Sequence, residues 1–505
     1  MVMESAGAGD SLVKAARKAL ETDPEGRAVE FGGRWYSFGE LKAAADQLLE
    51  RLEQSGAPRH ASVAFAPRNR PSAVATLLGL IIGRRNVQML YAYQSGASLA
   101  RNFARLQSDV LVADADEFTP EVVAQLAAMG CAGVALSGMT AALVPGCESV
   151  TRAPGRDPDS QPCVEILTSG TTGSARQYPL SYEELERRFV TANAAFAKEV
   201  LKDVAPPFVC YPMGNTSGLY SVLPSMLMQL PIVLVEKFSL AAWHDHLVRF
   251  RPTEIYLPPS GMQQLIDSNI PPEDLACARI MRSGMTHLPL EVHRAFEERY
   301  KVPVLISYGA TEFGGVVIQM TEELIPQWGK TKLGSTGRAY GEAQVRVVDP
   351  DTGEVLGPNE QGLLEVLVPS MSPEFRRTTD IARIDEDRFV YILGRADGAI
   401  QRGGFKILPE AIEGPLAQHP SVADAGVLAV ADERVGQVPA ALVVVAKGAQ
   451  QPSTSELEAF LREHVPATHI PVHWHFVDAI PRTSSEKIAR AGLREFHARL
   501  TDSAE

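Results

Sequence analysis

The chain has 505 residues, of which 45% are hydrophobic and 22% charged, a composition typical of a globular protein with roughly two to four domains. Its formal net charge of −13 argues against binding to nucleic acid or to an anionic membrane surface, because clustered Lys and Arg side chains hold phosphate backbones. The first residues contain no basic region that leads into an apolar one, so we expect a cytoplasmic protein without a secretory signal.

The sequence also disfavours a membrane-spanning protein and a protein built on disulfides or a zinc site. The most apolar segment, residues 73–82, is shorter than the roughly 20 residues that span a bilayer, and it predicts a buried helix instead. The cysteines are odd in number and never spaced C-x-x-C, so neither a disulfide framework nor a zinc site is indicated. They are Cys131, Cys147, Cys163, Cys210 and Cys277.

From the N-terminus onward, short apolar runs alternate with longer stretches of helical periodicity. Residues 62–66 predict a strand before a helix over 72–82, and residues 231–235 predict a strand before a helix over 241–250. This rhythm predicts an α/β fold.

A polar stretch at residues 153–162 is typical of a linker, and it leads into an apolar run at 164–167 and then into Thr168–Ser174. The hydroxyl side chains and glycines of this run let N–H and O–H donors crowd around phosphate oxygens, so it predicts a triphosphate-binding hairpin. Gly/Ser/Thr clusters between strands are also ordinary loops. Rossmann and Walker motifs do not fit, because the run continues as Ala175-Arg176-Gln177.

The character of the sequence changes near residue 334. Residues 343–348 and 362–368 predict strands separated by Asp/Pro/Gly turns, which indicates a small β-subdomain. Residues 394–398, Gly-Arg-Ala-Asp-Gly, are typical of a hinge into a final segment. We therefore expect a large N-terminal domain with several sheets over residues 1–394, including the β-subdomain at 334–394, and a small α+β lid domain over 395–505.

Six blocks of residues, in this order, resemble the adenylate-forming superfamily of acyl- and aryl-CoA synthetases, peptide-synthetase adenylation domains and beetle luciferases. The blocks are T-S-G-T-T-G-S at 168–174, Y-G-A-T-E at 308–312, T-T-D at 378–380, G-R-A-D at 394–397, R-G-G-F-K-I-L-P-E-A-I-E at 402–413 and P-R-T-S-S-E-K-I at 481–488. Together they cover nearly the whole chain, and the combination is far more specific than any single block.

The resemblance implies a ligase that uses ATP, Mg²⁺ and coenzyme A. A carboxylate would attack the α-phosphate of ATP to give acyl-AMP and pyrophosphate, and a thiol would then displace AMP. The acid would be of the fatty or aryl type. An alternative is a free-standing adenylation enzyme that loads a carrier protein, and an alternative of another class is a catalytically degraded adenylate-binding protein.

The resemblance also assigns roles to residues. Lys487 would neutralise the attacking carboxylate and the α-phosphate, Thr311 would bond the α-phosphate, and Glu312 would hold Mg²⁺. Asp397 would be the hinge of the lid, and Asp380 and Arg395 would bind the ribose hydroxyls. The other implied residues are Thr168, Ser169, Gly170, Thr171, Thr172 and Gly173 for the phosphates; Gly284, Met285, Thr286, Tyr308 and Gly309 for the rest of the nucleotide; and Gly403, Gly404 and Phe405 for the thiol tunnel.

For the acid, the resemblance implies a mostly apolar pocket lined by Tyr211, Asn215, Ser307 and Gly314. Asn215 would gate this pocket, although a loop amide in its position could instead cap the backbone. The sequence departs from the family at Arg176 and Gln177, where Lys-Gly is usual, and at Glu486, where Gly is usual. These departures put loop geometry and the reactivity of Lys487 in question.

His473 and His475 share one face of a predicted strand. Two histidines at this spacing can bind a metal, but no third ligand stands at a fixed distance in the sequence, so we expect a lid strand. The sequence leaves the oligomeric state, the pathway and the identity of the acid open.

Overall fold

The computed structural model describes residues 9–502 except 154, 169–175, 192–203, 285–287, 289, 351, 396–398, 408 and 482–489. The chain forms two compact units, Met1–Thr168 with Ala175–Pro252 and Ser169–Ser174 with Thr253–Glu505. The expected domain boundary after residue 394 is not the boundary of these units and stays a prediction.

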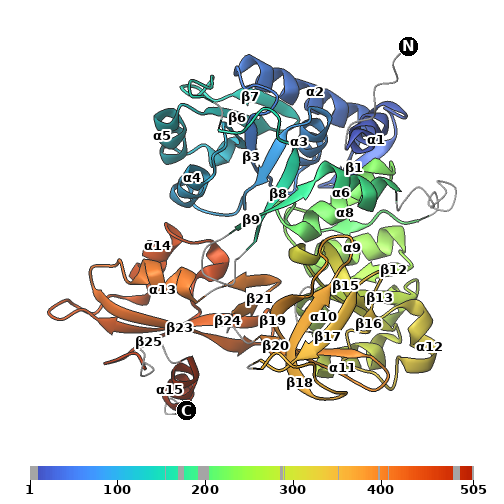
Figure 1. Ribbon diagram of the computed structural model, residues 1–505, viewed down its shortest axis with the longest axis vertical. Coiled ribbons are helices and arrows are strands. Elements are labelled where there is room, and N and C mark those ends of the chain that lie inside the picture. The colour runs from blue at the N-terminus through green and yellow to red at the C-terminus, as the bar shows by residue number, and fades with distance from the viewer. Residues whose placement is uncertain are drawn as a thin grey trace. The chain divides into compact units, whose positions relative to one another are not determined.

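The first unit is built on a seven-stranded sheet with the order β7-β6-β5-β3-β4-β8-β9 (Figure 1). The inner strands run parallel, and β7 and β9 pair antiparallel at the two edges. The strands are β3 (Ser62–Ala66), β4 (Asn86–Met89), β5 (Val110–Asp114), β6 (Ala132–Ser137), β7 (Thr140–Leu143), β8 (Cys163–Thr168) and β9 (Arg176–Ser181).

Both faces of this sheet are buried, which explains why its strands are continuous apolar runs. Along β3, Val63 and Phe65 pack in one core with α1 (Asp10–Glu21), α2 (Phe38–Gln54) and α3 (Pro71–Ile82). Ala64 and Ala66 point to the other face, where a second core includes residues of α4 (Gly96–Arg105) and α5 (Pro120–Met129). The predicted strand at 62–66 and the predicted buried helix at 73–82 are both confirmed.

The first unit also contains a four-stranded sheet, β10-β11-β1-β2. Its strands are β1 (Arg27–Phe31), β2 (Arg34–Ser37), β10 (Phe208–Val209) and β11 (Ile232–Leu234). The remaining helices are α6 (Tyr182–Glu186), α8 (Thr216–Leu227) and α9 (Leu240–Phe250), the last of which confirms the helix predicted over 241–250.

The second unit begins with a five-stranded sheet, β12-β13-β14-β15-β16. Its strands are β12 (Glu254–Tyr256), β13 (Ile280–Gly284), β14 (Val304–Ala310), β15 (Gly315–Gln319) and β16 (Arg338–Ala339), and the helices of this part are α10 (Pro259–Ile266), α11 (Leu290–Tyr300) and α12 (Ile325–Trp328). The strands β12, β13 and β14 are parallel, whereas β15 and β16 are antiparallel additions.

The expected β-subdomain is a four-stranded antiparallel sheet, β17-β18-β19-β20. It consists of β17 (Gln344–Val348), β18 (Gln361–Leu367), β19 (Arg376–Ile384) and β20 (Val390–Arg395). One face is apolar, with Leu364, Val366 and Val390 fully buried.

The C-terminal part is α+β, as the sequence predicts. The strands β21 (Ile400–Arg402), β22 (Phe405–Ile407), β23 (Val422–Asp432), β24 (Gly436–Val445) and β25 (His473–Phe476) form one sheet, which is accompanied by α13 (Glu410–Leu416), α14 (Thr454–Arg462) and α15 (Arg490–Asp502). The predicted fold class, a large multi-sheet N-terminal part with a β-subdomain and a small α+β C-terminal part, is therefore confirmed.

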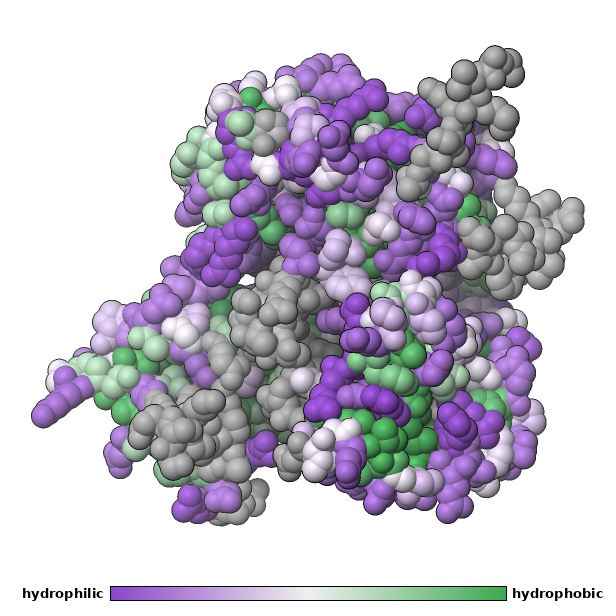
Figure 2. Space-filling model, in the orientation of Figure 1, coloured by the Kyte–Doolittle hydropathy of each residue, from purple (hydrophilic) through white to green (hydrophobic). Residues whose placement is uncertain are grey.

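Figure 2 shows hydrophilic residues over most of the visible face, in keeping with the charged composition. No helix in the described part of the chain combines the length and apolarity needed to cross a bilayer. All five cysteines are free thiols.

Candidate active site

The strands on either side of the predicted phosphate loop form an antiparallel hairpin. β8 ends at Thr168 and β9 begins at Arg176, and these two residues are Cα partners in the ladder. The residues between them, Ser169, Gly170, Thr171, Thr172 and Gly173 of the predicted phosphate site, lie outside the described residues. The predicted hairpin is confirmed by the pairing of β8 with β9, and the role of these residues in phosphate binding stays a prediction.

The Y-G-A-T-E block forms the turn between β14 and β15. Tyr308 and Gly309 lie in β14, and Thr311 and Glu312 lie in a short 3₁₀ turn, Thr311–Phe313. A Cβ atom on Gly309 would lie 2.1 Å from the carbonyl oxygen of Gly315, so no larger residue fits between these strands without a shift of the backbone. This close approach places the exposed Glu312 carboxylate at the tip of the turn.

The same turn explains Gly314. Its φ angle is 66°, in the left-handed region that glycine adopts without steric cost. This reversal lets the chain return directly along β14 as β15, which fixes the direction in which Thr311 and Glu312 leave the sheet.

Tyr308 and Asp380, which are 72 residues apart, are brought together by a hydrogen bond. The Tyr308 hydroxyl donates to Asp380 Oδ2 at 2.6 Å, and the Asp380 amide donates to Thr378 Oγ1 at 3.0 Å. Asp380 is only 5% exposed. In the β19–β20 ladder it is the Cα partner of Arg395, so the two predicted ribose-binding residues stand opposite each other.

Gly284 and Ser307 are neighbours on adjacent strands. They are Cα partners between β13 and β14, and a Cβ atom on Gly284 would lie 2.8 Å from the Ser307 carbonyl oxygen. Met285 and Thr286, the other two residues predicted to pass the adenine, lie outside the described residues. Gly284 is therefore explained by close packing of β13 against β14, and its contact with the adenine stays a prediction.

On the acid side, Tyr211 and Asn215 belong to the first unit and lie between β10 and α8. Asn215 is the N-cap residue of α8, but its side chain makes no capping hydrogen bond. Its backbone N–H donates to the Pro212 carbonyl oxygen at 3.0 Å. The Asn215 side chain therefore does not cap α8, which was the alternative to its role in the pocket.

The predicted thiol-tunnel residues form a tight hairpin between β21 and β22. Gly403 and Gly404 have φ angles of 53° and 87°, the left-handed pair that a two-residue type I′ turn requires. Phe405 is the ladder partner of Arg402, whose guanidinium donates to the carbonyl oxygens of Thr468 at 2.6 Å and Ile470 at 3.1 Å. The turn is thereby tied to the chain that leads into β25. Asp397 and Lys487, the predicted hinge and catalytic lysine, lie outside the described residues.

These groups suit an adenine nucleotide with Mg²⁺. Asp380 offers acceptor oxygens for ribose hydroxyls, and the glycines at 284 and 309 let their strands pack closely against neighbouring backbone. Among the described residues no three His, Cys, Asp or Glu side chains stand together as a preformed metal site. Mg²⁺ is commonly bound by one or two carboxylates together with substrate phosphates, and the predicted role of Glu312 as its protein ligand stays a prediction.

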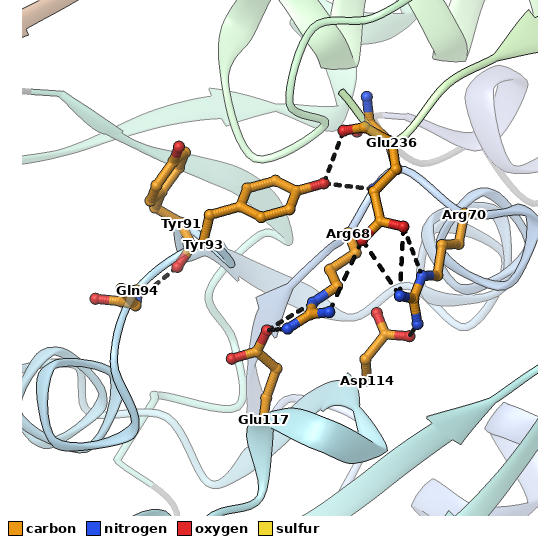
Figure 3. Close-up of polar contacts among 9 residues, drawn as sticks. Arg68, Arg70, Tyr91, Tyr93, Gln94, Asp114, Glu117 and Glu236 are labelled. Carbon is orange, nitrogen blue, oxygen red and sulfur yellow. Dashed lines mark hydrogen bonds and ion pairs between the residues drawn. The ribbon is translucent and has the colours of Figure 1, made fainter. Parts of the chain in front are cut away.

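Motif reasoning missed a polar network at the carboxyl ends of β3 and β5. The chain leaves β3 towards β4 and leaves β5 towards β6, on opposite sides, which makes this edge a topological switch point. Arg68 donates to Glu117 at 2.7 Å, and Arg70 donates to Asp114 at 2.8 Å (Figure 3). Arg70 also donates to Glu236, which follows β11, at 3.2 Å.

Two carboxylates of this network, Asp114 and Glu117, are buried, whereas Glu236 is half-buried. Burial raises the pKa of Asp114 and of Glu117 above their ordinary values, although their arginine partners oppose the shift. Apart from the adjacent strand end, no sequence signal marks these residues, because the loops that carry them are far apart in the chain.

Sequence reasoning also missed a third histidine beside His473 and His475. His497 of α15 is hydrogen bonded to His475, with 2.9 Å between Nδ1 and Nε2, and its ring centroid lies 5.9 Å from that of His473. The expected strand is confirmed as β25.

Comparisons with known proteins show the family to which the chain belongs. A sequence model described as AMP-binding enzyme matches residues 16–374, and one described as AMP-binding enzyme C-terminal domain matches residues 411–487. A 2-succinylbenzoate–CoA ligase of Geobacillus kaustophilus is 28% identical over 492 residues, which cover 93% of this chain and 95% of the relative. A 4-coumarate–CoA ligase-like protein of Oryza sativa subsp. japonica is 32% identical over 370 residues, 68% of this chain and 65% of the relative.

Solved structures show the same fold. The o-succinylbenzoate CoA synthetase of Bacillus subtilis superimposes with a TM-score of 0.76 at 22% identity, covering 95% of this chain and 98% of that one. An amide bond synthetase of Marinactinospora thermotolerans gives a TM-score of 0.78 at 23% identity, with 95% and 99% covered. The predicted enzyme class, an AMP-forming acid–thiol ligase of the adenylate-forming superfamily, is confirmed, and the chain belongs to the AMP-binding enzyme family.

Proposed function

We propose that the protein activates an aromatic or other aryl-bearing carboxylic acid with ATP and transfers the acyl group to coenzyme A. The aryl class is supported by the relatives, which are named as ligases of 2-succinylbenzoate and of 4-coumarate type. The observation that carries the nucleotide half of the proposal is the bond between Tyr308 and Asp380, which joins two of the six motif blocks in one place.

In the first step a carboxylate oxygen of the acid forms a bond to the α-phosphorus of ATP, and the bond from that phosphorus to the bridging oxygen of pyrophosphate breaks. Negative charge grows on the transferring phosphoryl group and on pyrophosphate, so preorganised donors and cations stabilise this transition state. Lys487, Thr311 and the hairpin tip after Thr168 would supply them. Bound Mg²⁺ would neutralise phosphate charge, with Glu312 as its protein ligand.

In the second step the thiol sulfur forms a bond to the acyl carbon, and the bond from that carbon to the phosphate oxygen breaks, releasing AMP. The Gly403-Gly404 turn and Phe405 would line the path of the thiol. Asp397 would be the hinge about which residues 395–505 turn between the two steps, which is how one lid can serve two chemistries.

The test is ATP/pyrophosphate exchange with a panel of aryl, fatty and amino acids, followed by addition of CoA and detection of AMP and thioester. We expect exchange with aryl acids and thioester with CoA. In Lys487→Ala we expect exchange to fall by about 100-fold or more, since removing one preorganised transition-state donor costs about that factor in other enzymes.

Each alternative has its own result in this assay. Exchange without CoA thioester would favour the enzyme that loads a carrier protein. Absence of exchange with every acid would favour the adenylate-binding protein. A cytoplasmic location is part of the proposal, and the five free thiols suit a reducing compartment.

A further inference from the structure

One asparagine connects the switch-point network to the acid side of the candidate site. Asn69 lies in the loop between β3 and α3 and is fully buried. Its Nδ2 group donates to the Tyr211 carbonyl oxygen at 2.8 Å and to the Val235 carbonyl oxygen at 3.2 Å. Its Oδ1 atom accepts from the Met213 N–H at 3.0 Å.

This pattern reproduces the hydrogen bonding of a parallel β-strand. In a parallel ladder one residue bonds the carbonyl before and the N–H after the residue opposite to it. The Asn69 side chain bonds the Tyr211 carbonyl and the Met213 N–H in the same way, with Pro212 in between. The amide therefore fixes both ends of the three-residue segment Tyr211–Met213.

The loop that carries Asn69 is itself held on both sides. Arg68 is bound to Glu117, and Arg70 is bound to Asp114 and to Glu236 (Figure 3). The Tyr93 hydroxyl donates to the Glu236 carbonyl oxygen at 3.0 Å. Ion pairs with buried carboxylates are costly to break, because the remaining charge is left without a partner. The backbone around Asn69 is therefore held in place by the ion pairs of the residues on either side of it.

The segment that Asn69 holds is also closely packed from another side. A Cβ atom on Gly214 would lie 2.8 Å from the Leu90 carbonyl oxygen, just beyond the end of β4. Residues 211–214 therefore lie directly on the carboxyl edge of the parallel strands. We assign two residues of this unit to the acid pocket. Tyr211 is the first residue of this segment, and Asn215 directly follows its last.

We propose that Asn69 is a positioning residue that sets the shape of the acid pocket, and hence the choice of acid, by holding the segment Tyr211–Met213. The proposal rests on the proposed function for the role of Tyr211 and Asn215. It names a residue about 140 positions away in the chain that touches no substrate and acts only through the backbone that it bonds.

Asn69→Asp is the sharpest test, because it keeps the size of the side chain and the acceptor for Met213. It replaces the donor with an oxygen that repels the Tyr211 and Val235 carbonyls. We expect the KM for the preferred acid to rise about 10-fold and the ranking of acids to change, while the KM for ATP stays within about 2-fold, since a shift in binding pocket geometry acts on the ligand that contacts it.

Asn86→Asp is the matched control. Asn86 is equally buried, begins β4 at the opposite end of the strands, and donates through Nδ2 to Ser62 Oγ at 3.0 Å and to Glu165 Oε1 at 2.9 Å. The Asn86→Asp variant thus introduces the same buried amide-to-carboxylate change in the same sheet. We expect it to lower thermal stability without changing the ranking of acids. A uniform loss for all acids and for ATP in both variants would overturn the proposal.

Amide hydrogen exchange of the ligand-free protein keeps this test independent of the assay. Asn69→Leu removes all three hydrogen bonds at similar side-chain size, and we expect faster exchange of the Met213 amide than in wild type or in Asn86→Asp. Unchanged protection of Met213 would overturn the positioning role even if every acid were active. If wild type showed no exchange of pyrophosphate with any acid but Met213 lost protection in Asn69→Leu, the proposed function would fail and the hold on the segment would stand.

Discussion

The nucleotide side and the acid side of the candidate site are built in different ways. On the nucleotide side, Tyr308, Gly309, Thr311 and Glu312 lie within five consecutive residues at the end of β14 and in the turn that follows it, and long-range hydrogen bonds join this group to Asp380 and to Arg376. On the acid side, the segment from Tyr211 to Met213 is held by Asn69, and the loop of Asn69 is held by ion pairs to the end of β5 and to the loop after β11.

The two sides differ in which contacts fix the positions of their residues. A turn between two paired strands fixes its own residues through backbone dihedrals and glycine close approach, so local sequence determines it. A segment between a two-residue strand and a helix has few backbone bonds of its own, and side chains from elsewhere must supply them. Substitutions far away in the chain should therefore affect the acid more than ATP.

The largest expected effect is on the nucleotide side, at Asp380. Asp380→Ala removes a buried acceptor that also receives the Tyr308 hydroxyl, and we expect kcat/KM for ATP to fall about 100-fold, the equivalent of about 2.7 kcal/mol for two charge-assisted hydrogen bonds. Initial rates at varied ATP measure it. The exposed Glu374, just before β19, provides the control, and a similar loss in Glu374→Ala would contradict a specific role for Asp380.

A graded version of the same change is Tyr308→Phe. It removes the 2.6 Å donor and keeps the Asp380 carboxylate, so we expect a loss of about 5- to 10-fold, corresponding to one hydrogen bond of about 1 to 1.4 kcal/mol. A loss equal to that of Asp380→Ala would mean that the carboxylate acts only through Tyr308 and not on the ribose.

On the acid side the corresponding test is Gly218→Ala in α8. A Cβ atom there would lie 2.1 Å from the Pro212 carbonyl oxygen and 2.7 Å from the Met213 Cα, so the segment held by Asn69 must move. We expect kcat/KM for the acid to fall about 30-fold while the KM for ATP stays within about 2-fold, because misplacement by about 1 Å carries costs near this size.

Gly414→Ala is the control for the glycine change itself, since nothing lies within 4 Å of its Cβ position. In α13 this change should leave kinetics unaltered and raise stability slightly, because alanine restricts the unfolded chain. If Gly218→Ala weakened ATP and acid equally, the separation between the two sides of the site would be wrong.

The same difference explains how much the sequence predicts. The α/β rhythm, the β-subdomain and the strand and helix near residues 62–82 follow from apolar periodicity, and the hairpin around Thr168–Arg176 follows from its glycines and hydroxyls. The motif blocks name Tyr308 and Asp380, although not their bond. Asn69, Asp114 and His497 have no local pattern, because their roles arise from partners more than 20 residues away.

The smallest expected effect concerns the C-terminal part, where His475 and His497 share a hydrogen bond of 2.9 Å. Burial lowers the pKa of both below the ordinary value of 6.5, and the neighbouring histidines lower it further. The facing strand β24 places Ala440, Ala441, Leu442 and Val443 opposite β25. Helix α15 itself also contains charged residues, among them Arg494, Glu495 and Arg499.

Because both folded pKa values are lower than the unfolded value, the unfolded chain takes up protons first on acidification. The stabilisation is therefore complete above about pH 6.5 and is lost as the pH falls through the folded pKa values. We expect the amides of α15 to exchange faster at pH 5.5 than at pH 7.5 after correction for intrinsic rates, and His497→Asn to abolish this dependence. His60→Asn, in the first unit, is the control. A pH dependence that persists in His497→Asn would show that titratable groups other than His497 control the docking of this helix.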